Sequence, residues 1–184
     1  MVDAFFHRLA GAARTDGADT GSADTGSAER LPATKHTAGP WDPGSQHGSP
    51  PAAMLGRACE RLPSSTGAAM TVSRFTMDLL GPIPVGELTV SAEVTRPGRS
   101  VDLSRAEITD VETGRVAARA HVWRSSASTS APSTVDAAPF AGPEAGATRA
   151  YPPDWHTSYL DAVEWSWIRG AVTDPGPTRP TGGS

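Results

Sequence analysis

The chain has 184 residues, a formal net charge of −4, and acidic and basic residues that are interspersed along its length. Its 19 Gly and 17 Pro residues favour one modest domain with long flexible parts over a single large core. The charge pattern offers neither a basic surface for nucleic acid nor a polybasic patch for a membrane. No apolar stretch has the length of a bilayer span, so we expect a cytoplasmic protein that binds neither nucleic acid nor membrane.

Residues 1–32 are expected to form a flexible N-terminal segment. A short apolar group near the start, which includes Phe5, Phe6 and Leu9, could dock on the domain or form a helical turn. The following stretch, DGADTGSADTGSAE, repeats small polar units and predicts a disordered low-complexity insert. The first strand is expected at residues 34–38, at the start of an ordered domain that covers residues 33–125.

A turn-rich loop runs into a helix within residues 41–62, WDPGSQHGSPPAAMLGRACERL. Ser49 is expected to cap this helix, the two following prolines suit its first turn, and Pro63 ends it. Helical spacing places one apolar stripe on it, which consists of Ala52, Leu55, Ala58, Cys59 and Leu62. Because the single cysteine falls on this stripe, it is expected to be a buried structural thiol.

Four strand patterns follow, at residues 69–80, 88–95, 100–110 and 116–122, with turn signals between them. The first has Phe75, Met77 and Leu79 on its inward face. In the third, the apolar phase shifts between Leu103 and Ala106, which predicts a bulge near Ser104 or Arg105. A strand, a buried helix and an antiparallel run of four strands predict an α+β fold in which a curled sheet wraps one helix.

The loop and helix, GPWDPGSQHGSPPAAMLGRACER, resemble the N-terminal repeat of acyl-CoA thioesterase II-like, double hotdog proteins. That repeat usually reads close to GPWD…QHGGPPAALLARALER, and this chain has Ser49 where a second Gly is common. The resemblance covers roughly residues 31–125. It implies a hotdog fold and hydrolysis of acyl thioesters to free acid and CoA, with acyl-CoA as substrate or ligand and with no cofactor.

Residues 126–150, rich in Ser, Pro, Ala and Gly, predict a disordered linker. Residues 151–184 are expected to be the incomplete start of a second hotdog repeat, with Val163, Trp165 and Trp167 on one face of a possible strand. In the resembled family the second repeat typically carries the catalytic Asp, Gln and Thr/Ser. The chain is therefore expected to form a homodimer that rebuilds a site, or to be a catalytically inactive acyl-binding or dimerisation module.

Thioester hydrolysis needs a polarised carbonyl and an activated water. The backbone N–H groups of Gly48 and Ser49 lie where a helix begins, and they suit a carbonyl oxygen or an anion. Trp41, in the loop before them, is a candidate substrate contact. The alternative for this tryptophan is a core or lid residue that packs the loop.

His47, Asp42 and Gln46 are the candidate catalytic residues of the same loop. The imidazole could accept the water proton, the carboxylate could do so or orient the imidazole, and the amide could position the water. The alternatives are a turn fixed by the carboxylate and a structural histidine.

The remaining motifs give weaker indications of function. The five histidines show no metal-ligand spacing, so no metal site is expected. The hairpin from Arg96 to Arg99 could meet the phosphates of CoA or could be a solvated turn.

Overall fold

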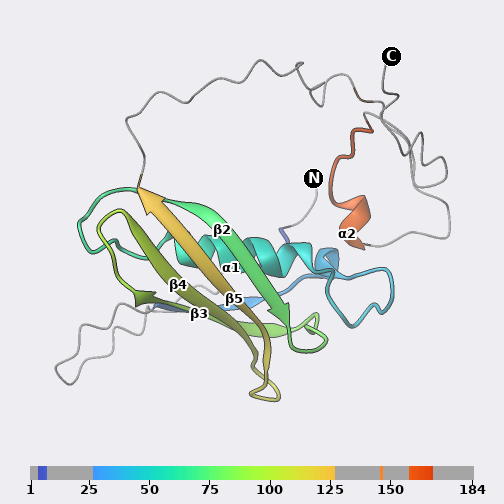
Figure 1. Cartoon of the computed structure of the whole chain (residues 1–184). Coiled ribbons are helices and arrows are strands. Elements are labelled where there is room, and N and C mark those ends of the chain that lie inside the picture. Colours follow the sequence, from blue (N-terminus) through green and yellow to red (C-terminus); the bar gives the residue numbers. More distant parts are fainter. Residues whose placement is uncertain (1–3, 8–26, 127–145, 147–157, 168–184) are drawn as a thin grey trace, which may run out of the picture.

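The computed structural model describes residues 4–7, 27–126, 146 and 158–167, and it contains an antiparallel sheet curled around one helix (Figure 1). The five strands of the sheet stand in the order β1-β3-β4-β5-β2. Along the chain the elements are β1 (Ser27–Pro32), the short 3-10 helix η1 (Lys35–Thr37), α1 (Ser49–Glu60), β2 (Met70–Leu79), β3 (Glu87–Arg96), β4 (Val101–Asp110), β5 (Val116–Ser126) and α2 (Ser158–Asp161).

The predicted apolar stripe of α1 faces the concave side of the sheet. Leu55 and Cys59 are fully buried, and Leu62, just beyond the helix, is 5% exposed. They pack in one core with the inward side chains of β3 to β5, among them Leu88 and Ile108. Burial also raises the pKa of the Cys59 thiol to about 11, which agrees with a structural role for this residue.

The prediction of a first strand at residues 34–38 is wrong. Residues 35–37 form the 3-10 helix η1, whose first free N–H, on His36, is accepted by the Thr34 hydroxyl. The first strand is β1, six residues that were assigned to the flexible segment 1–32, and it pairs antiparallel with β3. One buried apolar residue, Leu31, anchors it. The apolar pattern that would predict β1 is weak because backbone pairing with β3, and not a row of buried side chains, holds this strand. The rest of the predicted insert lies outside the described residues.

The other four strands are confirmed, with one inward residue assigned wrongly. Phe75 and Met77 of β2 pack against the core, but Leu79 is 59% exposed. This residue lies at the C-terminal end of β2, on an edge of the sheet. The predicted turn before β5 is present, and Gly114 adopts a positive φ of 68° there.

The predicted bulge in the third of these strands, β4, is wrong. Its inward positions keep an unbroken spacing of two, and they are Asp102, Ser104, Ala106, Ile108 and Asp110. The register shift instead lies on the neighbouring strand β3, between Val94 and Arg96. The apparent change of phase in the sequence arose because polar side chains occupy inward positions that were expected to be apolar.

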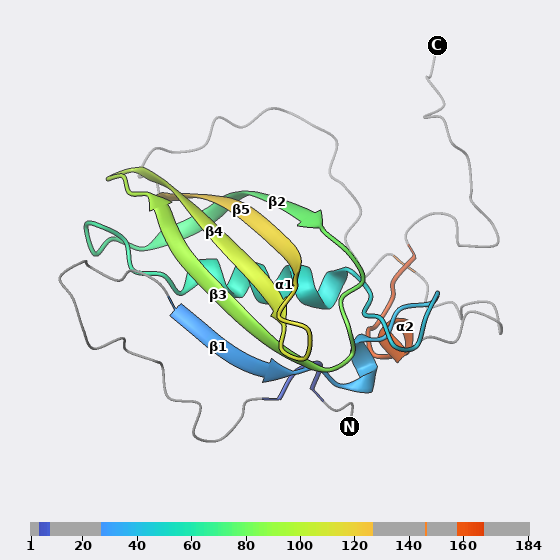
Figure 2. The ribbon, with the colours of Figure 1, turned by 90° about the horizontal axis from the view of Figure 1, so that it is seen from below.

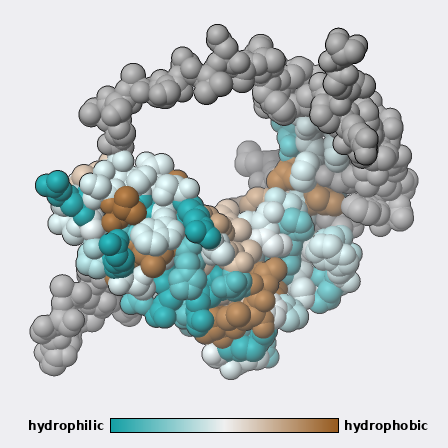
Figure 3. All heavy atoms as spheres, in the orientation of Figure 1, coloured by the Kyte–Doolittle hydropathy of each residue, from teal (hydrophilic) through white to brown (hydrophobic). Residues whose placement is uncertain are grey.

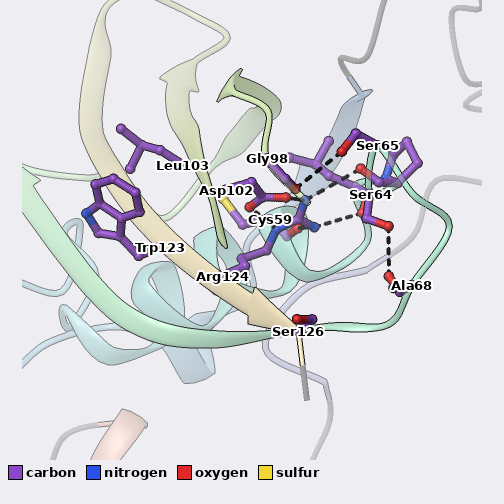
Figure 4. Close-up of polar contacts among 12 residues, drawn as sticks. Cys59, Ser64, Ser65, Ala68, Gly98, Asp102, Leu103, Trp123, Arg124 and Ser126 are labelled. Atoms are coloured by element: carbon purple, nitrogen blue, oxygen red, sulfur yellow. Dashed lines mark hydrogen bonds and ion pairs between the residues drawn. The ribbon is translucent and has the colours of Figure 1, made fainter. Parts of the chain in front are cut away.

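The reason for the inward Asp102 is a buried ion pair with Arg124 of β5 (Figure 4). The guanidinium donates to both carboxylate oxygens, at 2.9 and 2.6 Å, and the two side chains are 0% and 1% exposed. The same guanidinium donates to the carbonyls of Cys59 and Leu62, at 2.8 and 2.7 Å. These carbonyls lie at and just beyond the end of α1, and that of Cys59 also accepts the Leu62 N–H, at 3.2 Å. One side chain therefore ties two strands to the end of the helix.

Replacing this guanidinium should destabilise the fold strongly. In Arg124→Met the Asp102 charge stays buried without a partner and the Leu62 carbonyl loses its donor, so we expect a loss of about 3–5 kcal/mol in the free energy of unfolding. Urea denaturation measures this. Arg105→Met, which breaks the exposed Arg105–Glu93 pair on the outer face, is the matched control and should cost about 1 kcal/mol or less. Equal losses in both variants would contradict the structural role of Arg124.

The strand predicted around Val163, Trp165 and Trp167 is also wrong. Residues 158–161 form the helix α2, and residues 163–166 are in neither helix nor strand. The indole N–H of Trp165 donates to the carbonyl of Leu160, at 3.1 Å, and the two indole rings stack with centroids 6.4 Å apart. The linker and most of the predicted second repeat lie outside the described residues. In the part of the chain that is described, no helix is long and apolar enough to cross a bilayer.

Candidate functional site

The loop before α1 is held in place by backbone hydrogen bonds at both of its sides. The N–H of His47 donates to the carbonyl of Thr37, at 2.7 Å, and the N–H of Gln46 donates to that of Ile83, at 2.8 Å. Gly39 lies so close that an added Cβ would stand 3.2 Å from the His47 nitrogen. These contacts fix where the loop delivers its side chains, which is the N-terminal end of α1.

That helix end has few N–H groups to offer. Pro50 and Pro51 have none, and the Ala52 N–H is bonded to the Gly48 carbonyl, at 3.1 Å. The Ser49 N–H donates to Nδ1 of His47, at 3.2 Å. Among the described residues, nothing accepts a hydrogen bond from the Gly48 N–H.

The predicted capping role of Ser49 is wrong. Ser49 is the first residue of α1 and its side chain is exposed, while Gly48 occupies the cap position with φ −64° and ψ −23°. The helix has no side-chain cap in the usual position, and His47, one residue earlier, supplies the acceptor instead. Glycine tolerates the cap position, but nothing about its φ requires glycine.

His47 lies between two aromatic rings. Its ring is nearly parallel to that of Tyr159 of α2, with centroids 4.2 Å apart and planes at 9°, and to that of Trp41, at 6.5 Å and 7°. Burial lowers the pKa of His47 below its usual 6.5. Because Nδ1 accepts the Ser49 N–H, the neutral ring carries its proton on Nε2. The imidazole is thus arranged as a hydrogen-bond donor at Nε2.

Trp41 is not a core residue. It is 85% exposed, and its indole covers one face of His47 from the solvent side. Its position remains compatible with a substrate contact, which stays a prediction. The alternative of a core residue is wrong because residues 41–44 are all exposed, so this part of the loop lies at the surface.

Asp42 and Gln46 lie in the same loop, and neither bonds to the imidazole of His47. The Asp42 carboxylate accepts the Ser45 hydroxyl, at 2.6 Å, and the Gly44 N–H, at 2.9 Å, and these two bonds hold its pKa below the usual value. The Gln46 amide donates to the Pro84 carbonyl, at 2.7 Å. Its Oε1 is buried with no partner among the described residues. The catalytic roles suggested for both remain predictions.

An apolar pocket of about 460 Å³ opens beside this helix end. It lies between α1, β1, α2 and residues 4–7, and Figure 2 shows β1 running along α1 with α2 beside the start of the helix. Its lining residues are Phe5, Phe6, Leu31, Ser49, Pro50, Ala53, Met54, Arg57, Tyr159 and Val163. Sequence reasoning missed the aromatic members because they come from segments far from the loop. The apolar group at residues 4–6 was the one available signal.

The other candidate sites from the sequence are the hairpin from Arg96 to Arg99 and a metal site, which was not expected. The guanidinium of Arg96 lies over the ring of Trp123, 5.9 Å from its centroid. The structure therefore shows an aromatic contact for this arginine and does not test a contact with CoA phosphates. Within the described part of the chain, no group of three or more His, Cys, Asp or Glu side chains could hold a metal ion.

Comparison with known proteins places this geometry in a structural context. Residues 37–125 match the family model described as the acyl-CoA thioesterase N-terminal domain. The fold is the hotdog fold. Among solved structures, it is similar to the Escherichia coli PaaI protein from the phenylacetic acid degradation operon, at 21% identity and a TM-score of 0.51, over 56% of this chain and 74% of that one.

Two further solved structures share this hotdog fold. The smu.793 protein from Streptococcus mutans UA159, bound to acetyl-CoA, has 13% identity and a TM-score of 0.51, over 56% of this chain and 82% of that one. Zebrafish thioesterase superfamily member 2 has 14% identity and a TM-score of 0.51, over 59% and 79%. Identities this low support the fold alone. No curated protein matches the chain at the level of its sequence.

The tautomer and pKa of His47 can be measured directly. We expect ¹⁵N NMR of the imidazole to show a proton on Nε2 and a titration midpoint below 6.5, and we expect Tyr159→Ala, which exposes the ring, to raise that midpoint. Because the folded-state pKa is lowered, the neutral ring contributes its stability in full above pH 6.5 and loses it as the pH falls through the folded-state pKa. A midpoint at or above 6.5, or a proton on Nδ1, would refute this geometry.

Proposed function

We propose that this hotdog protein is an acyl-CoA thioesterase that hydrolyses an acyl thioester to free acid and CoA at the N-terminal end of α1. One observation carries the proposal. The unengaged Gly48 N–H lies next to Ser49 and Pro50, which are part of the wall of the apolar pocket. A thioester carbonyl can therefore meet a hydrogen-bond donor while its acyl chain lies on apolar surface.

The Gly48 N–H is the proposed donor to the carbonyl oxygen. The positive end of the helix dipole favours the negative charge that develops on this oxygen when water attacks. The Nε2–H of His47 is a second donor in the same loop, and its stacking between Trp41 and Tyr159 orients it without flexible side-chain torsions. Exposed Trp41 is proposed to contact the CoA portion outside the pocket.

Activation of the water is the least complete part of this site. Nδ1 of His47 is occupied by the Ser49 N–H, and both oxygens of Asp42 accept hydrogen bonds that weaken its basicity. Within the described residues, both candidate bases already accept hydrogen bonds, which makes each a weaker acceptor for a proton from water. This favours the second candidate function, an acyl-binding module without hydrolysis, unless a second copy of the chain supplies the base.

A homodimer is part of the proposal. β2 is an edge strand of the sheet, and Figure 3 shows apolar surface gathered over its C-terminal end. Leu79 and Leu80 are 59% and 50% exposed there. An apolar area beside an unpaired edge favours association with another chain. The solved Streptococcus mutans protein of the same fold is bound to acetyl-CoA, which supports an acyl-CoA ligand for this chain as well.

Gly48 allows a matched pair of variants. Gly48→Pro removes the N–H and fits the observed φ of −64°, whereas Gly48→Ala keeps the N–H and places its Cβ where nothing lies within 4 Å. We expect the proline variant to lower kcat for acyl-CoA hydrolysis by about 10²–10³-fold and the alanine variant to change it little. Release of free CoA measures both, with thermal unfolding as the control for folding. Equal activity in the two variants would remove the proposed role of this N–H.

The enzyme and the binding module differ in one pair of measurements on the same sample. The thioesterase predicts release of free thiol from acyl-CoA, and light scattering should show a dimer whose loss in Leu79→Lys/Leu80→Lys abolishes the release. The binding module predicts saturable binding of acyl-CoA with no release. A monomer with full turnover would refute the dimer.

A further inference from the structure

Besides β1, which contributes Leu31, two more segments outside the matched region 37–125 complete the pocket beside α1. Phe5 and Phe6 come from residues 4–7, and Tyr159 and Val163 come from α2 and the turn that follows it. The rings of Phe5 and Tyr159 lie with centroids 5.8 Å apart, so the two segments meet over the pocket. The pocket therefore has walls that the matched domain does not provide by itself.

Both segments are anchored to the domain by hydrogen bonds. The Thr34 hydroxyl donates to the carbonyl of Ala4, at 2.8 Å, and the N–H of His7 donates to that of Pro32, at 3.0 Å. The N–H of Tyr159 donates to the carbonyl of Ala38, at 3.3 Å. These contacts fix the aromatic walls relative to α1 and β1.

One face of α1 forms the length of the pocket. Ser49, Ala53 and Arg57 follow each other at intervals of four residues, and they span about 12 Å along the helix. At the far end the Arg57 guanidinium donates to the Glu29 carboxylate of β1, at 3.1 Å. This ion pair bridges α1 and β1. Arg57 is the lining residue of α1 that lies farthest along the helix from Gly48.

We infer that the pocket takes an unbranched, uncharged acyl chain of about eight to ten carbons, and that the Arg57–Glu29 pair sets its upper length. An extended chain advances about 1.2 Å per bond, so about ten bonds fill the distance from the helix start to the ion pair. The volume of about 460 Å³ falls within the usual range for small-molecule pockets. This inference rests on the proposed function in one respect only, which is the position of the acyl carbonyl at the N-terminal end of α1.

The charges at the far end argue for an uncharged chain terminus. Arg57 is already paired with Glu29, and Arg61 also approaches this carboxylate, at 3.8 Å. A carboxylate at the end of the ligand would have to displace Glu29 from Arg57. Longer chains would have to part the ion pair, and shorter chains would leave apolar wall uncovered.

The test is the affinity of the full chain for saturated carboxylic acids of 4 to 16 carbons without CoA, by displacement of a fluorescent fatty acid. We expect the tightest binding at 8 to 10 carbons. Ala53→Phe, which fills the middle of the pocket from an exposed helix position, should weaken decanoate binding by at least about tenfold and leave butanoate nearly unchanged. Glu60→Phe places the same ring at an exposed position of α1 outside the pocket, and should alter neither.

The length limit has its own variant. Glu29→Ala/Arg57→Ala removes the ion pair and should move the optimum to longer chains, whereas Glu93→Ala/Arg105→Ala, an exposed pair on the sheet, should not. A flat length profile, or no effect of Ala53→Phe, would overturn the inference. The inference would also be overturned if the cause of that result is another segment or a second copy of the chain that fills the pocket. Length-selective binding without thiol release from acyl-CoA would reject the hydrolysis alone. Thiol release with a flat profile would reject the inference alone.

Discussion

The central helix depends on side chains from elsewhere to satisfy both of its ends. A helix leaves N–H groups free at its start and carbonyls free at its end. At the end of α1, the buried Arg124 donates to two of these carbonyls and is itself paired with Asp102. At the start, His47 accepts one N–H and two prolines remove others, which leaves the Gly48 N–H unengaged. The end that Arg124 satisfies and the end with an unengaged donor among the described residues thus follow from one constraint.

The two ends of α1 also differ in their position relative to the apolar pocket, which opens beside the start of the helix. Ser49 and Pro50 at the start of α1 line the pocket, and Tyr159, one of its aromatic lining residues, also stacks on His47. Closure of the pocket and orientation of the imidazole are therefore coupled through one side chain. A ligand that pushes Tyr159 aside would expose the imidazole to water and raise its pKa.

The sequence predicted the parts of the fold that apolar periodicity determines. The helix and four of the strands follow from alternation that the core then confirms, as with Leu55 and Leu88. The sequence did not predict the structure correctly where backbone pairing or a buried charge determines it. β1 has one buried anchor, Leu31, and β4 turns Asp102 inward because a distant arginine completes it. No local pattern reveals a partner that is 22 residues away.

The site was predictable in its loop and not in its walls. Turn residues and prolines predicted a helix start with Ser49 as the cap, and the structure places the cap one residue earlier, at Gly48. The acceptor role of His47 toward the Ser49 N–H is local to the loop. The stacking by Tyr159 depends on a contact between segments more than a hundred residues apart, and spacing within the loop carries no information about it. The turn held by the Asp42 carboxylate is local as well, and it corresponds to the alternative that the sequence analysis offers for this residue.

The central claim is that the Gly48 N–H binds the carbonyl of an acyl thioester. The most direct measurement is a ¹H–¹⁵N NMR titration with a ketone analogue of decanoyl-CoA, whose carbonyl is not hydrolysed. The account predicts a saturable downfield shift of the Gly48 amide proton as it gains an acceptor, with no change at Gly114 in the distant turn before β5. Saturable binding that leaves the Gly48 amide unchanged would contradict it.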